Sequence, residues 1–64
     1  MAGNLLALRS RRFMTQVELA KAAGVSPTTI NRVETGKMDP RFSTIKKLAA
    51  ALGVTPEELA GPAE

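Results

Sequence analysis

The sequence predicts an all-α fold, a compact bundle of five short helices in one domain that spans residues 1–64. Three observations predict it. Ala, Leu, Lys, Glu and Arg, which favour helix, dominate the chain. The alternation of apolar and polar residues that is typical of strands is missing. Capping residues and glycines punctuate the chain at the spacing of short helices, and they place these helices at about residues 3–12, 16–23, 27–34, 41–52 and 56–60.

Capping residues mark the second and third helices most clearly. Thr15 and Glu18 have the spacing of a capping box, so Thr15 is the expected N-cap of the helix at 16–23. Gly24 ends that helix in a left-handed conformation. The third helix begins with Ser26 as N-cap and Pro27 at the first helical position, where its missing N–H costs nothing.

A related capping sequence occurs twice, as GVSPTTI at residues 24–30 and as GVTPEEL at residues 53–59. The second copy has two glutamates in its first helical turn, where acids are favoured by the positive end of the helix dipole. The first copy has Thr28 and Thr29 instead. Because acids would repel phosphate, we interpret the threonines as keeping this helix end open to nucleic acid. The alternative is that they are merely tolerated at exposed positions.

The composition excludes several classes of function. The chain has no cysteine or histidine, which removes disulfides, thiolate metal sites, and the commonest metal ligand and general base. We therefore expect no metal, no cofactor and no enzymatic activity. No apolar run approaches the ~20 residues of a membrane span, and arginines interrupt the N-terminal segment before a signal peptide can form. These features favour a cytoplasmic protein without a membrane partner.

Positive charge is concentrated before residue 51. All nine Lys and Arg lie there, and three acidic residues oppose them, which leaves a formal charge of +6 over residues 1–50. Such a field favours a polyanionic partner. A solvated basic surface without a partner would have the same composition.

The helices at 16–23 and 27–34 are joined by a very short link, which favours the sharp angle of a helix-turn-helix unit. Ala20 is small where the third helix would cross the second, and Gly24 provides the left-handed turn. Ile30 and Val33 lie three residues apart and direct one side of the third helix toward the core. A helical hairpin without a ligand is the alternative.

The other side of the third helix is polar, basic and free of acids. Its residues follow from the ~100° step per residue once the two aliphatic residues face inward: they are Thr28, Arg32 and Thr35, with Thr29 and Asn31 on the flanks. In a major groove, Arg32 can bond guanine O6 and N7 as a bidentate pair. The Thr28 methyl can meet a thymine methyl, and Asn31 can read adenine or hold a phosphate.

The segment LRSRRFMTQVELAKAAGVSPTTINRVETGK resembles the phage-repressor-like helix-turn-helix family of Cro and the phage repressors, also called the xenobiotic-response-element family. The residues that match keep the family's spacing: Leu8, Arg9, Thr15, Gln16, Glu18, Leu19, Ala20, Ala23, Gly24, Val25, Ser26, Ile30, Glu34 and Gly36. The segment LAAALGVTPEEL matches the last two helices, so the resemblance covers about residues 4–60. It implies a lambda-repressor-like fold and a bacterial or phage DNA-binding regulator that usually acts as a dimer.

The resemblance also implies roles for individual residues. The base-reading positions of the family fall on Pro27, Thr28 and Arg32, although a proline offers no polar side chain. Family members grip a phosphate from the start of the second helix, which is Gln16 here.

We expect further phosphate contacts around the third helix. The side chains of Lys37 and Arg41 would supply charge, and backbone N–H groups of Gly36 and Phe42 would bind without charge. Thr29 would add a hydroxyl, and Thr35 is also among the residues that we expect to bind phosphate. Four other basic residues are interpreted as solvated charges: Arg11, Arg12, Lys46 and Lys47.

Glu34 requires a separate explanation. It lies only ~40° from Ile30 around the third helix, and a carboxylate at this inner edge needs a partner. The family resemblance pairs it with Arg9, which would hold the first helix against the third. Alternatively, the side chain of Glu34 extends to water.

These observations predict sequence-specific binding of double-stranded DNA by a transcriptional regulator, which we expect to be a repressor. A homodimer would bind a palindromic operator, with half-sites about one helical turn apart, and Leu52, Val54 and Leu59 are the candidate dimer patch. One alternative is an antitoxin-like module that binds a protein partner as well as DNA. RNA binding is another, but only Phe13 and Phe42 are available for base stacking, which disfavours single-strand recognition.

Overall fold

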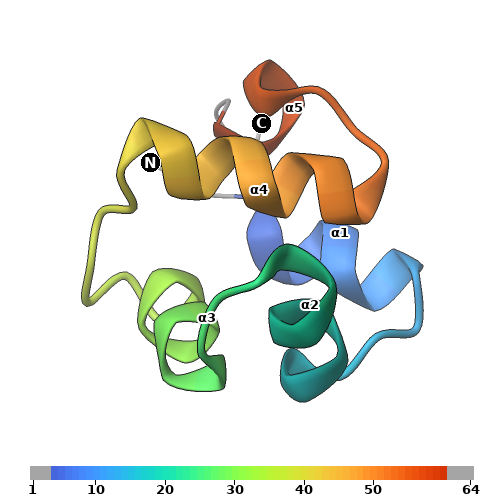
Figure 1. The fold of residues 1–64 in the computed structure, drawn as a ribbon, viewed down its shortest axis with the longest axis horizontal. Helices are drawn as coiled ribbons and strands as arrows, with labels where there is room; N and C mark the ends of the chain where they lie inside the picture. The colour runs from blue at the N-terminus through green and yellow to red at the C-terminus, as the bar shows by residue number, and fades with distance from the viewer. Residues whose placement is uncertain (1–3, 61–64) are drawn as a thin grey trace.

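The computed structural model describes residues 4–60. Within that range the chain is all helical, as predicted, and no strand is present. The five helices are α1 (Leu5–Arg11), α2 (Gln16–Ala23), α3 (Pro27–Glu34), α4 (Phe42–Leu52) and α5 (Pro56–Ala60) (Figure 1).

The predicted helix boundaries need two corrections. α1 is shorter than expected, because Asn4 is its N-cap and Arg12 its C-cap; the predicted start at residue 3 lies outside the described residues. α4 begins at Phe42 because Arg41 has an extended backbone and serves as the N-cap. The bounds of α2, α3 and α5 agree with the prediction.

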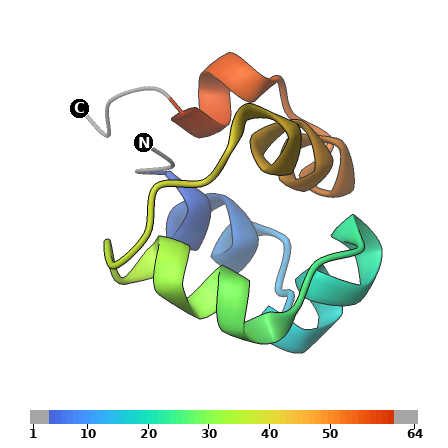
Figure 2. The same cartoon turned by 60° about the vertical axis from the view of Figure 1, so that its left-hand side comes forward.

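The helices pack so that α4 separates α5 from the α2–α3 pair. α4 contacts both α2 and α5, and α1 contacts α3 and α5 (Figure 1). Figure 2 shows α3 along the outer edge of the molecule, on the side away from α5. One side of α3 is therefore left facing solvent.

All five helices contribute to one apolar core. Its fully buried large side chains are Leu5, Leu19, Ile30, Leu48, Leu52 and Leu59. A domain of this size buries only about 60% of the surface its unfolded chain exposes. Each of these side chains therefore contributes a large share of the net stability.

The composition of the core contradicts part of the predicted dimer patch. Leu52 and Leu59 are only 1% and 0% exposed, and Val54 is half-buried against the same core. Because α4 packs against α5, Leu52 and Leu59 are buried within the chain itself. These two residues are not available to a second copy, so the prediction that they belong to a dimer patch is wrong.

The predicted caps of α2 and α3 are present. The Thr15 hydroxyl accepts from the Glu18 N–H at 3.0 Å, and the Glu18 carboxylate accepts from the Thr15 N–H at 2.8 Å, which completes the capping box. The Ser26 hydroxyl accepts from the Thr29 N–H at 3.1 Å. Both helices therefore begin where the sequence predicts.

The cap of α5 explains part of the difference between the two related sequences. The Glu58 N–H donates to the Thr55 hydroxyl at 3.1 Å, and the Thr55 N–H donates to the Glu58 carboxylate at 3.4 Å. Glu58 thus completes a second capping box, in addition to that of α2. At the matching position of α3, the Thr29 hydroxyl bonds the Ser26 hydroxyl at 2.9 Å instead. The start of α3 is capped without a negative charge.

We expect Thr15→Ala to destabilise the fold by about 1 kcal/mol, because the hydroxyl is the side-chain partner of an otherwise unsatisfied helix N–H. In a domain of this size the loss lowers the melting temperature by roughly 4–8 °C. Thermal unfolding followed by circular dichroism measures it. Ser10→Ala, at an exposed position of α1, is the control and should change stability by less than about 0.5 kcal/mol. Equal losses in the two variants would contradict a capping role.

Candidate nucleic-acid interface

The two sides of α3 differ completely in burial. Ile30 and Val33 are 0% and 6% exposed and anchor the inner side in the core. The outer side carries the residues expected to face DNA, and all of them are exposed: Pro27, Thr28, Asn31, Arg32 and Thr35. The rest of the described chain leaves this side uncovered (Figure 2).

The turn between α2 and α3 sets the direction of α3. Gly24 has a φ of 74°, a left-handed conformation that glycine adopts without steric cost. The Gly24 and Val25 N–H groups both donate to the Ala20 carbonyl, at 2.8 and 3.0 Å. Ala20 itself is 1% exposed, and α2 packs against α3. These contacts form the helix-turn-helix unit that the sequence predicts.

An ion pair joins α1 to α3. The Arg9 guanidinium donates to the Glu34 carboxylate from Nε at 2.5 Å and from Nη2 at 3.0 Å. The two side chains are only 15% and 5% exposed. The hydrogen bond to Glu34 raises the pKa of Arg9 above its usual value. The carboxylate at the inner edge of α3 therefore has a charged partner.

The same group of residues extends to α2 and to the link before it. The Gln16 Nε2 donates to Glu34 Oε1 at 2.9 Å, and the Arg9 Nη1 donates to the Met14 carbonyl at 2.7 Å. The link also contains Phe13, which has a left-handed φ of 53° and a 93% exposed side chain. Arg9, Gln16 and Glu34 thus connect the first three helices through one carboxylate. We call these three residues the α1–α2–α3 network.

The residues expected to bind phosphate come from α2, α3, the α3–α4 connection and the start of α4. Gln16 begins α2, where its side chain belongs to the network. The others lie at either end of α3, in the α3–α4 connection or at the start of α4: they are Thr29, Thr35, Gly36, Lys37, Arg41 and Phe42. In the free chain the Thr29 and Thr35 hydroxyls already have protein partners, the Ser26 hydroxyl and the Asn31 carbonyl.

The start of α4 suits an anion for a reason that the sequence did not make clear. Its N-cap, Arg41, makes no side-chain capping hydrogen bond, and the first turn has no acid. The first N–H groups of an α-helix, here from Phe42 onward, have no partner within the helix itself.

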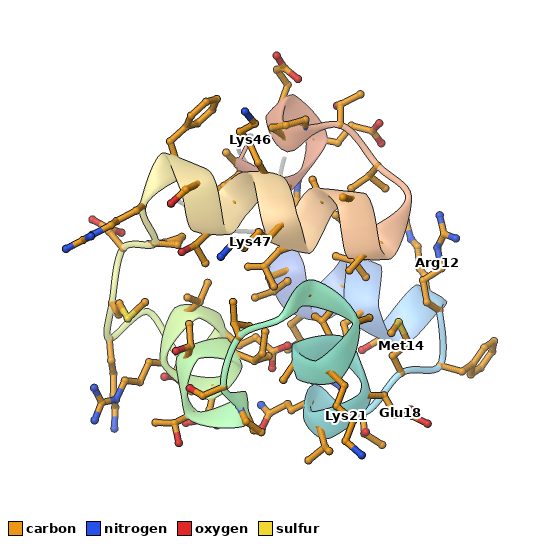
Figure 3. The ribbon with its side chains drawn as sticks, viewed as in Figure 1. Arg12, Met14, Glu18, Lys21, Lys46 and Lys47 are labelled. Atoms are coloured by element: carbon orange, nitrogen blue, oxygen red, sulfur yellow. The ribbon has the colours of Figure 1, made fainter. Side chains whose placement is uncertain are left out.

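Two other basic side chains, Arg12 and Lys46, lie beside residues of α4 or its C-cap and not beside α3. A Cβ atom on Gly53 would lie 3.4 Å from Nη2 of Arg12, so this guanidinium sits at the C-terminal end of α4 (Figure 3). A cation there is favoured by the helix dipole. The Lys46 Nζ lies 5.5 Å from the centroid of the Phe42 ring, a cation–π contact on α4 itself. The interpretation of Arg12 as a purely solvated charge is therefore incomplete, because its guanidinium lies beside Gly53 at the C-terminal end of α4.

Comparison with known proteins identifies the family. A family model described as "Helix-turn-helix" matches residues 5–59. The chain belongs to this helix-turn-helix family. The resemblance to the phage-repressor-like proteins, inferred from the sequence, is thereby confirmed.

Two curated proteins similar to this helix-turn-helix chain are named as a transcriptional repressor and an antitoxin. The HTH-type transcriptional repressor RghR of Bacillus subtilis is 48% identical over 56 residues, which cover 86% of this chain and 42% of the repressor. Antitoxin HigA1 of Mycobacterium tuberculosis is 42% identical over 48 residues, or 75% of this chain and 32% of the antitoxin. The chain thus spans less than half the length of these curated relatives.

A solved structure agrees with the fold. The crystal structure of the hypothetical transcription factor NHTF from Neisseria superposes with a TM-score of 0.88 at 35% identity, and the match covers 94% of this chain and 69% of that one. Within residues 4–60, no helix of this helix-turn-helix protein is long and apolar enough to cross a membrane.

The contact between Gln16 and Glu34 was not predicted from the sequence. The two residues are 18 positions apart in the chain, on separate helices, and no local pattern links them. Only the packing of α2 against α3 brings the amide to the carboxylate. The inner-edge position of Glu34 signals the need for a partner but does not show that it has two.

We expect Glu34→Gln to lower the free energy of unfolding by about 1–3 kcal/mol, because hydrogen bonds to a charged group lose that much when the charge is removed. Chemical denaturation measures the loss. Glu57→Gln removes an exposed carboxylate of α5 and should cost only a few tenths of a kcal/mol. At high salt the Glu57 effect should vanish and the Glu34 effect should persist, since buried pairs are screened less. An unchanged stability in Glu34→Gln would reject a structural role for the pair.

Proposed function

We propose that this chain is the DNA-binding domain of a transcriptional regulator, that it binds specific double-stranded sequences, and that the regulator is a repressor. The exposed outer side of α3 is the observation that carries the proposal. It is polar, it includes Arg32, and it has no acid. Family membership and the similarity to a named transcriptional repressor support the same function.

In this proposal α3 lies in the major groove with its outer side against the base edges. Arg32 bonds guanine through two N–H groups, the Thr28 methyl meets thymine, and Asn31 reads adenine or holds a phosphate. Pro27 contributes an apolar contact at most, because its side chain has no hydrogen-bonding group. The domain consequently reads few bases directly.

Phosphate contacts hold the helix in register. Gln16 starts α2 and lies beside Glu34 at the C-terminal end of α3. Beyond that end, Lys37 and Arg41 supply charge, and the backbone N–H groups of Gly36 and Phe42 bind without it. Thr29 and Thr35 complete this phosphate set with their hydroxyls.

We further propose that the regulator binds as a homodimer on a palindromic operator in the cytoplasm, and that it needs no cofactor and performs no catalysis. One copy of α3 spans only a few base pairs, so a second copy about one helical turn away extends the sequence that is read. Since Leu52 and Leu59 are buried in the core, the dimer contact has to use other residues.

The protein should bind duplex DNA with an affinity that falls steeply as salt rises, because each neutralised phosphate contributes about 0.9 to the slope of log affinity against log salt. Fluorescence anisotropy at several salt concentrations measures the slope. Selection from a random duplex pool should then enrich a palindrome with half-sites roughly 10 base pairs apart. Binding without enrichment would contradict sequence-specific recognition, and no binding at low salt would reject the DNA function altogether.

Two substitutions should separate base reading from phosphate binding. Arg32→Ala should cost about 1–3 kcal/mol of binding to the selected site and relax specificity at one position of each half-site. Lys37→Ala should weaken all sequences alike and reduce the salt slope by about one per subunit. Affinities for the selected site and for its single-base variants measure both effects. A uniform loss in Arg32→Ala would contradict a base contact.

An antitoxin-like module is the second candidate, because Antitoxin HigA1 is among the similar proteins. Such a module binds a protein partner in addition to its promoter. Three large apolar side chains remain exposed on α1, α2 and the link between them and would suit such a surface: Leu6, Phe13 and Val17. Because this candidate also binds DNA, failure to bind duplex DNA in low salt would count against both candidates.

A further inference from the structure

We propose that Glu34, which faces away from the groove, positions the Gln16 side chain for its phosphate contact. The inference rests on the proposed DNA-binding function and adds a residue to it. It comes from the α1–α2–α3 network, in which one carboxylate accepts hydrogen bonds from both Arg9 and Gln16. Glu34 is thus a positioning residue, and it does not touch DNA itself.

The chemistry of the two groups fixes which way the Gln16 amide is turned. A carboxylate only accepts hydrogen bonds, whereas a glutamine amide has both a donating nitrogen and an accepting oxygen. Glu34 Oε1 therefore selects the orientation in which Nε2 points toward it, at 2.9 Å. One hydrogen of the Gln16 NH₂ is used in this contact. The second remains for an acceptor outside the chain, and a phosphate oxygen accepts such a hydrogen bond.

The arrangement also removes the repulsion that a carboxylate near phosphate would cause. Arg9 donates to both oxygens of Glu34 and cancels its charge. The Glu34 side chain is only 5% exposed, so the group presented at the surface is the amide and not the acid. Replacing Arg9 would expose DNA to this acid, which is a second reason for the pair besides stability.

Orientation before binding reduces the cost of binding. A free glutamine side chain loses rotamer entropy when it is ordered. Because Glu34 orders Gln16 in the unbound protein, that loss belongs to folding and not to association. The contribution of Gln16 to DNA affinity should consequently depend on Glu34.

A double-mutant cycle on DNA affinity tests the dependence. In the wild type, Gln16→Ala should weaken binding to the selected duplex about tenfold. The salt slope should not change, because the amide carries no charge. In a Glu34→Ala background, the same Gln16→Ala substitution should weaken binding less than twofold further. In a Glu34→Gln background, whose amide oxygen can still accept from Gln16, most of the tenfold effect should return.

Matched controls distinguish positioning from a general loss of stability. Ile45→Ala removes a buried side chain of α4, outside the network, and Gln16→Ala should keep its tenfold effect in that background. Lys37→Ala should cost the same factor in the wild type and in Glu34→Ala. A tenfold effect of Gln16→Ala that persists in Glu34→Ala would overturn the positioning role while leaving the DNA function intact. A wild type that binds no duplex in low salt would overturn both.

A measurement on the wild type covers the case in which Glu34→Ala does not fold. Gln16 is the only glutamine in the chain, so its side-chain amide gives an easily assigned NMR signal. Nitrogen-15 relaxation in the absence of DNA should give an order parameter approaching that of rigid backbone, about 0.85. A value below about 0.6, typical of a flexible group, would overturn the proposal.

Discussion

Burial of Ile30 and Val33 is the constraint on which the arrangement of α3 depends. These two side chains lie three residues apart on a helix of 8 residues, and they fix its rotation about its own axis. Once they are in the core, the ~100° step per residue leaves Thr28 and Arg32 facing solvent. The chemistry of the interface is therefore a consequence of packing on the opposite side of the same helix.

The α1–α2–α3 network adds a second constraint, on the relative positions of helices. An apolar core tolerates small shifts between helices, because dispersion contacts are non-directional. A bidentate arginine–carboxylate pair does not tolerate such shifts, because its two parallel hydrogen bonds form only at one relative position of the two side chains. Arg9 and Glu34 therefore hold α1 and α3 in register, and the bond from Gln16 extends the same restriction to the start of α2.

The helices differ in whether an acidic side chain caps their N-terminal end. The chain uses an acid to cap α2 and α5, at Glu18 and Glu58. It uses hydroxyls alone at the start of α3, and no side-chain cap at the start of α4. The starts of α3 and α4 thus lack acids in their first turn, at the cost of the stabilisation that an acid provides near a helix N-terminus. The start of α2, which carries Gln16, keeps Glu18.

Local signals in the sequence were enough to determine the five helices, the caps at Thr15 and Ser26 and the outward side of α3. Each of these depends on residues within one or two helical turns, where spacing alone sets the geometry. The tertiary structure decided what depends on residues distant in the chain. It buried Leu52 and Leu59 between α4 and α5, where the sequence had suggested a dimer patch. It also brought Gln16 to Glu34, because only packing places side chains from separate helices within hydrogen-bonding distance.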